Sequence, residues 1–409
     1  MSPVKTAPAA LTAGDSALRT QYLAEVLGLL YPPPCHTDGT PGEPIAEYVV
    51  VPDLRRPRLL VPAGSRRVAT AAVRLYAEPQ SRSAKLKRHA VVTALRTGAS
   101  RVLLRDRIRV TGPVGASIDG HLRAALGRDL AVSVHIGPAR ANRKPVLQLI
   151  SPDGATFGFG KIGTGPLTRR LVRAETSALT ALGYSGLTKL TVPKVLYSGQ
   201  WRGLQVLIQS ALPVWLPRAP LQQHRLTAAM LDIAGCCGWS AGRLAGSAYW
   251  AELRGRLAAV GERPEGVALA AAVERLAARA GQISLRYGAW HGDWAPWNMA
   301  NLGDALLVWD WERFATGVPV GFDAIHHDLQ KRIQGRGDAA GAVELTVRSA
   351  GELLEPFGVS PHARELTALL YLVDLAVRYL TDRQAEAGAR LGVLGTWLLP
   401  VLIRRVEEL

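Results

Sequence analysis

The sequence predicts an α+β protein in which short strands precede a mainly helical second half. Five segments between residues 131 and 209 alternate apolar and polar residues with the period of two that is typical of strands, and one helical run follows the third. From residue 213 onward the apolar residues recur mostly with a helical period. With 409 residues, 48% of them hydrophobic, the chain is long enough to form two or three compact units.

The cysteine content and the apolar runs favour a reducing compartment. The three cysteines, Cys35, Cys236 and Cys237, form neither a disulfide framework nor a metal-ligand spacing. The first twenty residues lack the apolar core of a signal peptide. The longest apolar run, Leu391 to Ile403, is too short to cross a bilayer. We therefore expect a cytoplasmic protein with no membrane span.

The positive charge is concentrated near the front of the chain. The formal net charge is +16, and residues 51–110 contain 15 Lys and Arg against 3 Asp and Glu, which places +12 of it there. One interpretation is an arginine-rich solvated face, because Arg outnumbers Lys 41 to 8. The other is a surface for an anionic partner such as nucleic acid, a polyphosphate-bearing polymer or anionic lipid. The sequence leaves both open.

The first 127 residues are predicted to precede the main strand-rich part. Residues 1–45 form a partly disordered leader, with a short helix from Ser16 to Leu30. Residues 46–127 form a basic extension or cap. Within it, residues 46–62 have the pattern of a hairpin, residues 65–97 a helical pattern, and residues 102–110 that of a strand.

The strand-rich part is predicted to cover residues 128–212. Its five strands are expected at residues 131–136, 146–150, 155–162, 192–197 and 204–209, with a helix at residues 167–182. The turn Asp153-Gly154 is a strong hairpin signal between the second and third strands. Residues 213–409 then form a helical part.

One stretch in the helical part carries a pattern of reactive residues. Residues 289–323 contain His291, Asp293 and Asn298 with the spacing H-x-D-x-x-x-x-N, and Asp310 follows an apolar run. Transfer of a phosphoryl group from a magnesium nucleotide needs one carboxylate to orient the attacking hydroxyl and accept its proton, and further oxygen ligands to hold metal on the phosphates. Asp293 fits the first role, and Asn298 and Asp310 fit the second.

These residues resemble a known group of enzymes. HGDWAPWN followed by VWDWE, then Pro319 and Asp323, is similar to the motifs of the aminoglycoside phosphotransferase and choline kinase group of small-molecule kinases. The resemblance implies a two-lobed, protein-kinase-like fold with a five-stranded N-lobe at residues 128–212 and a mostly helical C-lobe at residues 213–409. It also implies ATP, with GTP as an alternative, and Mg²⁺. Asp323 matches the family aspartate that braces the catalytic loop.

The resemblance also assigns the nucleotide-binding residues of the N-lobe. Lys161 lies on the third predicted strand and Glu175 on the following helix, so they match the lysine that clamps the α- and β-phosphates and the glutamate that holds it. Gln209 to Ala211 match the hinge, whose backbone groups reach the edge of the adenine. Residues 137–144 occupy the place of the phosphate-covering loop, with Arg140, Asn142 and Arg143 as donors.

The predicted activity is ATP-dependent phosphorylation of a hydroxyl of a small molecule: a sugar, an amino sugar or an amino alcohol. Residues 213–290, which would hold the acceptor, contain 9 Lys and Arg against 5 Asp and Glu, which favours a neutral or anionic acceptor over a polycationic one. The alternative is a nucleotide-binding pseudokinase or scaffold that recruits an anionic partner through its basic front segment.

Four further residues lie near the motif. Two tryptophans have two possible roles, and two histidines are expected to have only a structural position. Trp294 and Trp297 flank the catalytic loop, either as a stacking wall for a sugar ring or as core. His326 and His327 are expected on a helix surface, because neighbours on a helix point about 100° apart and cannot converge on one ion.

Overall fold

A computed structural model describes residues 13–74, 82–97, 104–137, 142–387 and 391–409. The chain divides into two compact units. The first contains residues 1–139, 143–169 and 195–211, and the second contains residues 140–142, 170–194 and 212–409. The α+β class is confirmed, because the first unit is built on a sheet and the second is mostly helical. The domain boundaries predicted from the sequence stay a proposal.

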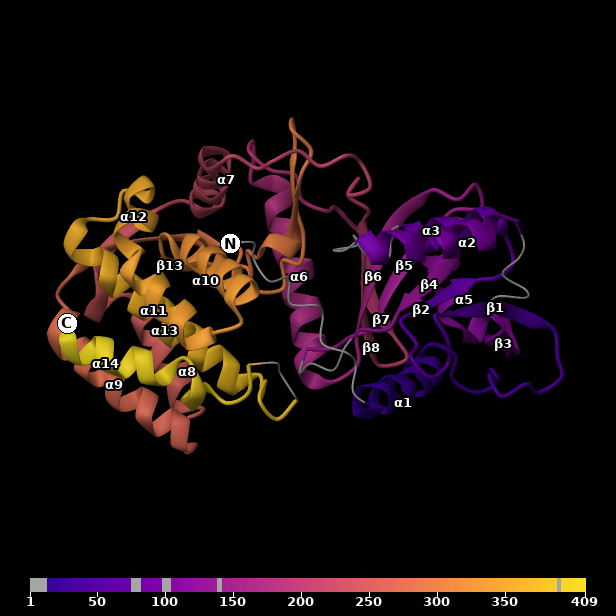
Figure 1. Cartoon of the computed structure of the whole chain (residues 1–409), viewed down its shortest axis with the longest axis horizontal. Helices are drawn as coiled ribbons and strands as arrows, with labels where there is room; N and C mark the ends of the chain where they lie inside the picture. The colour runs from indigo at the N-terminus through magenta and orange to yellow at the C-terminus, as the bar shows by residue number, and fades with distance from the viewer. Residues whose placement is uncertain (1–12, 75–81, 98–103, 138–141, 388–390) are drawn as a thin grey trace. The chain divides into compact units, whose positions relative to one another are not determined.

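The first unit contains one eight-stranded antiparallel sheet. Its strand order is β3-β1-β2-β4-β5-β6-β8-β7 (Figure 1). The strands are β1 (Pro44–Val51), β2 (Leu59–Pro62), β3 (Arg107–Thr111), β4 (Ala131–His135), β5 (Val146–Ile150), β6 (Thr156–Gly163), β7 (Val195–Trp201) and β8 (Leu204–Ser210). The five strands predicted between residues 131 and 209 are β4 to β8, each within a few residues of its expected bounds.

The prediction of a five-stranded sheet is wrong in one respect. Strands β1, β2 and β3 join the same sheet, because Leu59 and Leu60 of β2 pair with His135 and Val134 at the edge of β4. Both faces of β2 are apolar and fully covered: Leu60 packs into one core cluster, and Leu59 and Val61 into another. A strand buried on both faces is stabilised inside a sheet, and the pairing also covers the free edge of β4.

Helices cover both faces of this sheet. On one face, α1 (Ala13–Leu30) and α5 (Ile118–Leu126) pack their apolar side chains on those of β4, β5 and β8. On the other face, α2 (Arg66–Arg74) and α3 (Arg82–Thr97) lie over β1, β2 and β5 (Figure 1). Predicted helices at residues 16–30 and 65–97 therefore correspond to α1 and to the pair α2–α3. Residues 1–12, 75–81 and 98–103 lie outside the described residues.

Four residues of strands β6 and β8 lie on the face of the sheet that α2 and α3 cover. Lys161 lies opposite Leu207, and Phe159 lies opposite Gln209. Residues two apart on a strand, and residues directly opposite on neighbouring strands, share a face. Lys161 and Gln209 are both buried. Two of the residues that the sequence assigns to nucleotide binding, Lys161 and Gln209, therefore occupy one face of the sheet.

The second unit is a helical bundle with two small sheets. Its strands are β9 (Ser240–Arg243), β10 (Ser284–Trp290), β11 (Met299–Asn301), β12 (Leu306–Val308) and β13 (Ala315–Pro319), in sheets β13-β10-β9 and β11-β12. Its helices are α6 (Pro166–Tyr184, from Arg170 onward), α7 (Gln223–Gly235), α8 (Ala248–Ala258), α9 (Pro264–Ala280), α10 (Phe322–Arg336), α11 (Ala339–Arg348), α12 (Ala350–Leu354), α13 (Pro361–Thr381) and α14 (Leu399–Glu408).

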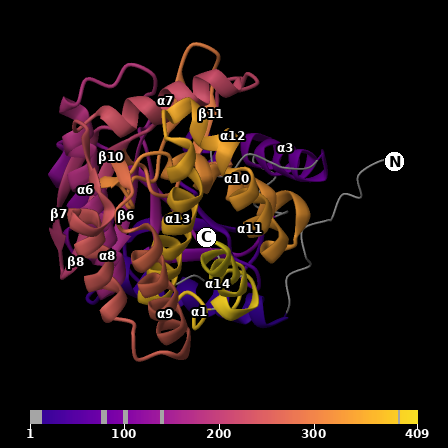
Figure 2. The same ribbon diagram turned by 90° about the vertical axis from the view of Figure 1, so that its left-hand side faces the viewer.

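Helix α13 forms the centre of this bundle. It lies among α8, α9, α10, α11 and α14 (Figure 2), and its residues from Leu366 to Val377 are buried, including Tyr371 and Asp374. Asp374 is paired with Arg256 of α8, whose Nη2 donates to Oδ2 at 2.7 Å. Because most of its buried residues are apolar and packed, α13 provides a rigid support for groups that face β10 and α10. Among the described residues, no helix is long and apolar enough to cross a membrane.

Candidate functional site

The HGD residues form a tight turn directly after β10. Gly292 has φ +83°, and a Cβ placed there would lie 2.2 Å from the carbonyl oxygen of Arg313, so only glycine fits. Its own carbonyl accepts a hydrogen bond of 2.5 Å from Nη1 of Arg378 on α13. The turn is therefore fixed from two sides, and it sets the direction in which Asp293 leaves the strand.

Asp323, at the start of α10, braces this turn as the sequence predicts. Its two carboxylate oxygens accept the backbone N–H groups of His291, at 2.7 Å, and Gly292, at 3.1 Å. Burial raises the pKa of Asp323 to about 7, although both amides act in the opposite direction. Both oxygens are used on the backbone, so Asp323 is a structural group of the site.

His291 is buried and supports the loop as a neutral ring. Its Nε2 lies 3.1 Å from the carbonyl oxygen of Trp309, which only accepts, so Nε2 donates. Nδ1 then accepts the N–H of Asp293, at 3.1 Å. Burial lowers the pKa of His291 to about 4, which outweighs the nearby charge of Asp293. The ring therefore joins the catalytic loop to the end of β12 without carrying charge.

His291 makes the stability of the second unit depend on pH. Its pKa is about 4 in the folded chain and about 6.5 when exposed, so between these values the unfolded state binds more protons. Stability is therefore full above pH 6.5 and falls as the pH decreases toward 4, by up to about 3 kcal/mol from this group. Urea unfolding of wild type and His291→Asn, followed by tryptophan fluorescence at pH 7.5 and 4.5, measures this contribution.

The difference between the variants is the relevant quantity in that measurement. Asp323, with a raised pKa, has the opposite sign: its contribution is present at low pH and is lost as the pH rises toward 7. His291→Asn is expected to lose less stability on acidification than wild type does, and His362→Asn, at an exposed position, to behave like wild type. Equal losses in wild type and His291→Asn would contradict the assignment.

Asp293 is held by a donor on each carboxylate oxygen. Asn298, which ends the 3₁₀ turn η3 (Pro296–Asn298), donates from Nδ2 to Oδ2 at 3.0 Å. His326 of α10 lies with Nε2 3.1 Å from Oδ1, and its Nδ1 lies 2.8 Å from the hydroxyl of Tyr371. With an ionised carboxylate, which only accepts, Nε2 carries the proton and Tyr371 donates to Nδ1.

This arrangement keeps Asp293 ionised. Burial alone would raise the pKa of Asp293, but the hydrogen bond from His326 and the charge of Arg378 act in the opposite direction, and the pKa lies below its usual value. Burial lowers the pKa of His326 despite its bond to Asp293. The Asp293 side chain is 35% exposed, so a ligand can still reach it. Each carboxylate oxygen has a second lone pair, which can accept a hydrogen bond from the hydroxyl group of a substrate.

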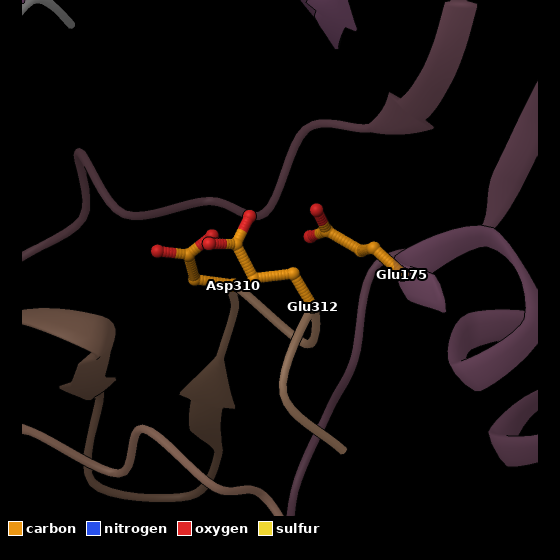
Figure 3. A group of neighbouring side chains, drawn as sticks. All are labelled: Glu175, Asp310 and Glu312. Atoms are coloured by element: carbon orange, nitrogen blue, oxygen red, sulfur yellow. The ribbon is translucent and has the colours of Figure 1, made fainter. Parts of the chain in front are cut away.

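Asp310 lies within a group of three carboxylates. Its neighbours are Glu312, two residues on, and Glu175 of α6. Each of the three residues has one carboxylate oxygen within 4.8 Å of those of the other two. Figure 3 shows that the three side chains converge. Glu175 accepts the N–H of Trp311 at 3.3 Å. Asp310 has φ +75°, which turns its side chain sharply out of the chain direction that follows β12.

Backbone hydrogen bonds place Asn298 beside this group of carboxylates. Its carbonyl accepts the N–H of Trp309 at 3.0 Å, and β11 pairs with β12 from Met299 to Asn301. Its Nδ2 donates to both the carbonyl and the carboxylate of Asp293, so a cation would bind through Oδ1. Carboxylate and amide oxygens are the ligands that Mg²⁺ prefers, and Asn298, Asp310, Glu312 and Glu175 supply them.

The other predicted nucleotide-binding residues lie in the first unit. Gln209 has a buried side-chain oxygen, Oε1, with no hydrogen-bond partner among the described residues. Ala211 donates its N–H to the carbonyl of Phe157 at 2.9 Å, so that amide is used within the unit. Arg143 stacks on the ring of Tyr22, and Arg140 lies outside the described residues. The pairing of Lys161 with Glu175 stays a prediction, because the two belong to different units.

The structure corrects one expectation and decides another. His326 is 1% exposed and touches Asp293, so the prediction of a surface position for it is wrong; helix α10 turns this residue toward the catalytic loop. Its spacing of three from Asp323 is the signal that could have found it, because residues three apart share a helix face. Trp294 is fully buried and belongs to the core, whereas Trp297 is 45% exposed.

No family model matches the chain, and no curated protein matches its sequence. Several solved structures resemble its fold. A protein from Thermobifida fusca described as a fructosamine-3-kinase is 18% identical, with 73% of this chain and 100% of that chain covered and a TM-score of 0.45. A thermostable mutant of aminoglycoside phosphotransferase APH(4)-Ia is 14% identical, with 71% and 98% covered and a TM-score of 0.44.

A third such structure is spectinomycin phosphotransferase APH(9)-Ia in complex with ADP and spectinomycin, 13% identical over 71% of this chain and 97% of that chain, with a TM-score of 0.41. These proteins are small-molecule kinases of the group that residues 289–323 resemble. With identities of 18% or less and TM-scores below 0.5, the likeness does not decide which reaction this chain performs.

Proposed function

We propose that the chain transfers the terminal phosphoryl group of magnesium-bound ATP to a hydroxyl of a small molecule. The observation that carries this proposal is the ionised, doubly held carboxylate of Asp293 on a loop whose next turn brings Asp310 into a group of oxygen ligands. Phosphoryl transfer asks the protein mainly to position groups and to neutralise charge, and this arrangement can do both.

In this mechanism Asp293 orients the acceptor. The hydroxyl donates to a carboxylate oxygen, which fixes the direction of attack. The carboxylate takes the proton as the new oxygen–phosphorus bond forms and the bond from the γ-phosphorus to the bridging oxygen breaks, with ADP as the leaving group. Asn298 and His326 restrict rotation of the carboxylate, and Tyr371 restricts the ring of His326. His291 supports the loop and does not act as the base, because Nδ1 is used by the N–H of Asp293.

Mg²⁺ would be held by Asp310 and Asn298, and when bound it neutralises charge on the phosphates. Glu312, two residues after Asp310 in the same carboxylate group, would be a further ligand. It is 5% exposed, and its Oε1 accepts a hydrogen bond of 3.1 Å from Asn142. Residues 137–144 were predicted to lie over the phosphates, and the bond from Asn142 ties the end of that segment to the carboxylate group.

ATP is the nucleotide that the buried side chain of Gln209 favours. Its Oε1 is an acceptor without a described partner, and a buried acceptor is stabilised by a donor. The 6-amino group of adenine is a donor, whereas guanine has an acceptor at that position. Lys161, on the same face of the sheet, is the proposed ligand of the α- and β-phosphates, with Glu175 as its partner. Ala211 would meet the base through its carbonyl.

The acceptor class is a sugar, an amino sugar or an amino alcohol, as predicted from the sequence. The test is transfer of label from γ-labelled ATP to a panel of such compounds in the presence of Mg²⁺, with GTP in parallel. Transfer to at least one class, dependent on Mg²⁺, is the expected result. Magnesium-dependent ATP binding with no acceptor in any class would instead favour the pseudokinase alternative, and no nucleotide binding would reject both.

His326 is expected to set the pH range in which Asp293 works. In His326→Phe the carboxylate loses a hydrogen bond that stabilises its charged form, so the pKa of Asp293 rises and the acid limb of the kcat profile moves to higher pH. We expect kcat to fall by about 10²-fold with little change in KM for ATP. His326→Gln, which keeps a donor, should recover part of the rate.

The control for this prediction is His224→Phe, at an exposed position of α7. It should leave both kcat and the pH profile unchanged. A His326→Phe enzyme that is slower at every pH by the same factor, with an unmoved acid limb, would show that His326 supports the fold of the loop and does not act on the charge of Asp293.

A further inference from the structure

A basic cavity lies in the first unit, on the face of the sheet that α2 and α3 cover. Its volume is about 330 Å³, which is at the small end of the range for ligand pockets. Four arginines line it, together with Thr70, Ala71 and the β5–β6 turn; they are Arg66, Arg67 and Arg74 of α2 and Arg96 of α3. Figure 1 shows α2 and α3 together over this part of the sheet.

The arginines of α2 form a single stripe on its outer side. Arg66, Thr70 and Arg74 are four residues apart, and Arg67 lies beside them, so all four share a helix face about 12 Å long. The opposite face, with Val68, Ala69, Ala72 and Val73, is buried against the sheet. Folding of the helix on its apolar side therefore directs the guanidinium groups into the cavity.

The turn between β5 and β6 forms the other wall. Gly154 has φ +88°, and a Cβ placed there would lie 3.4 Å from the backbone of Arg67, so the turn packs directly on the first turn of α2. Asp153 is the one acidic residue among the described residues of the lining. It accepts hydrogen bonds from the hydroxyl of Ser151 and the N–H of Ala155, which lower its pKa. Asp153 therefore stabilises the turn and does not pair with the arginines. The described lining residues have a formal charge of +3.

This charge is not neutralised by the chain. Within the described ranges, no carboxylate forms an ion pair with any of the four arginines, and all four are exposed. Two of them occupy the first turn of α2, where the helix dipole disfavours positive charge and no acidic residue compensates. Repulsion among the four adds to this cost. An anionic ligand would remove both terms, and arginine forks bind phosphate with paired hydrogen bonds.

We infer that this cavity binds a small molecule that carries two or more phosphate groups. Three guanidinium groups along about 12 Å of α2, together with that of Arg96 on α3, exceed what one phosphate can contact. Among the described residues, the lining has no aromatic side chain on which a base could stack, which argues against single-stranded nucleic acid. Of the lining residues that the structure describes, Ala71 alone has an apolar side chain, which argues against a membrane surface. An anionic partner for residues 51–110 is one of the two interpretations that the sequence leaves open, and the cavity favours a small ligand as that partner.

The test uses the full chain and two probes, inorganic pyrophosphate and fructose 1,6-bisphosphate, at constant ionic strength. Binding is measured by calorimetry and by the shift in Tm. The pocket variant is Arg67→Gln with Arg74→Gln. The matched control is Arg55→Gln with Arg56→Gln, which removes the same charge from exposed residues of the β1–β2 turn outside the cavity.

At least one probe is expected to bind wild type and the control alike, and to bind the pocket variant at least tenfold more weakly. Without ligand, the pocket variant should have a Tm equal to or above that of the control, because repulsion is removed. Should it fail to fold, Arg67→Lys with Arg74→Lys keeps the charge and removes the fork, and its binding should still weaken.

Three results would overturn the inference. The first is that neither probe binds, or that binding weakens equally in the pocket variant and in the control. Equal weakening would mean that the probe responds to the overall positive charge and not to this cavity. The second is binding that is lost in Asp310→Asn and kept in the pocket variant, which would place the probe at the proposed nucleotide site. The third is binding of RNA or of phosphatidylserine vesicles that depends on Arg67 and Arg74 while neither probe binds, which would indicate a macromolecular partner.

Discussion

Asp293→Asn is expected to lower the rate of phosphoryl transfer by about 10³-fold while nucleotide affinity stays within a factor of two or three. The substitution removes the negative charge that accepts the hydroxyl proton and leaves the size of the side chain unchanged. No predicted ligand of the nucleotide is altered, because the phosphate and metal ligands are other residues. Single-turnover transfer from γ-labelled ATP gives the rate, and calorimetric titration with a non-hydrolysable ATP analogue gives the affinity.

The local structure can accommodate this change. The new amide can keep its oxygen toward Nδ2 of Asn298 and donate from its nitrogen to Nε2 of His326, provided that the ring carries its proton on Nδ1 and Tyr371 accepts it. The expected loss is therefore chemical and not a loss of folding. Asp304→Asn, on the exposed β11–β12 turn, is the matched control and should behave as wild type. Transfer within tenfold of wild type would remove Asp293 from its role.

The local part of the fold could be predicted from the sequence, and the long-range part could not. Strands β4 to β8 follow from alternation within each segment and from the turn at Asp153-Gly154. The joining of β2 to β4 brings Leu59 beside His135, residues far apart in the chain, and no local period reports such a pairing. The front segment therefore had the pattern of a separate extension, although its strands complete one sheet.

The same division holds within the site. Asp293, Asn298 and Asp310 lie on two loops joined by a short hairpin, so their spacing in the sequence predicts their proximity. His326 and Tyr371 come from α10 and α13, and only the packing of these helices brings them to Asp293. Phe322, buried against Tyr371, fixes the start of α10 and thereby the direction of His326. Such contacts depend on tertiary packing and have no linear motif.

Asp310→Asn is expected to abolish stabilisation of the chain by magnesium nucleotides and to reduce transfer below detection. A ligand at a hundred times its Kd raises the free energy of unfolding by about 2.7 kcal/mol, which a thermal shift resolves. The variant keeps an oxygen at the site but loses the charge that holds a divalent cation. Because asparagine tolerates the left-handed backbone region, the φ of +75° at this position is not a reason for misfolding.

The three carboxylates make this prediction specific. In wild type, Glu175, Asp310 and Glu312 place oxygen atoms within 4.8 Å of one another, and a divalent cation relieves their mutual repulsion. Glu312→Gln should therefore weaken the affinity for Mg²⁺ about tenfold and keep some transfer, whereas Asp304→Asn should change neither the affinity nor the transfer. Tm measured with ATP and ADP, each with and without Mg²⁺, separates these cases. A magnesium-dependent shift that persists in Asp310→Asn would place the cation on other ligands, and the proposed mechanism would lose its metal site.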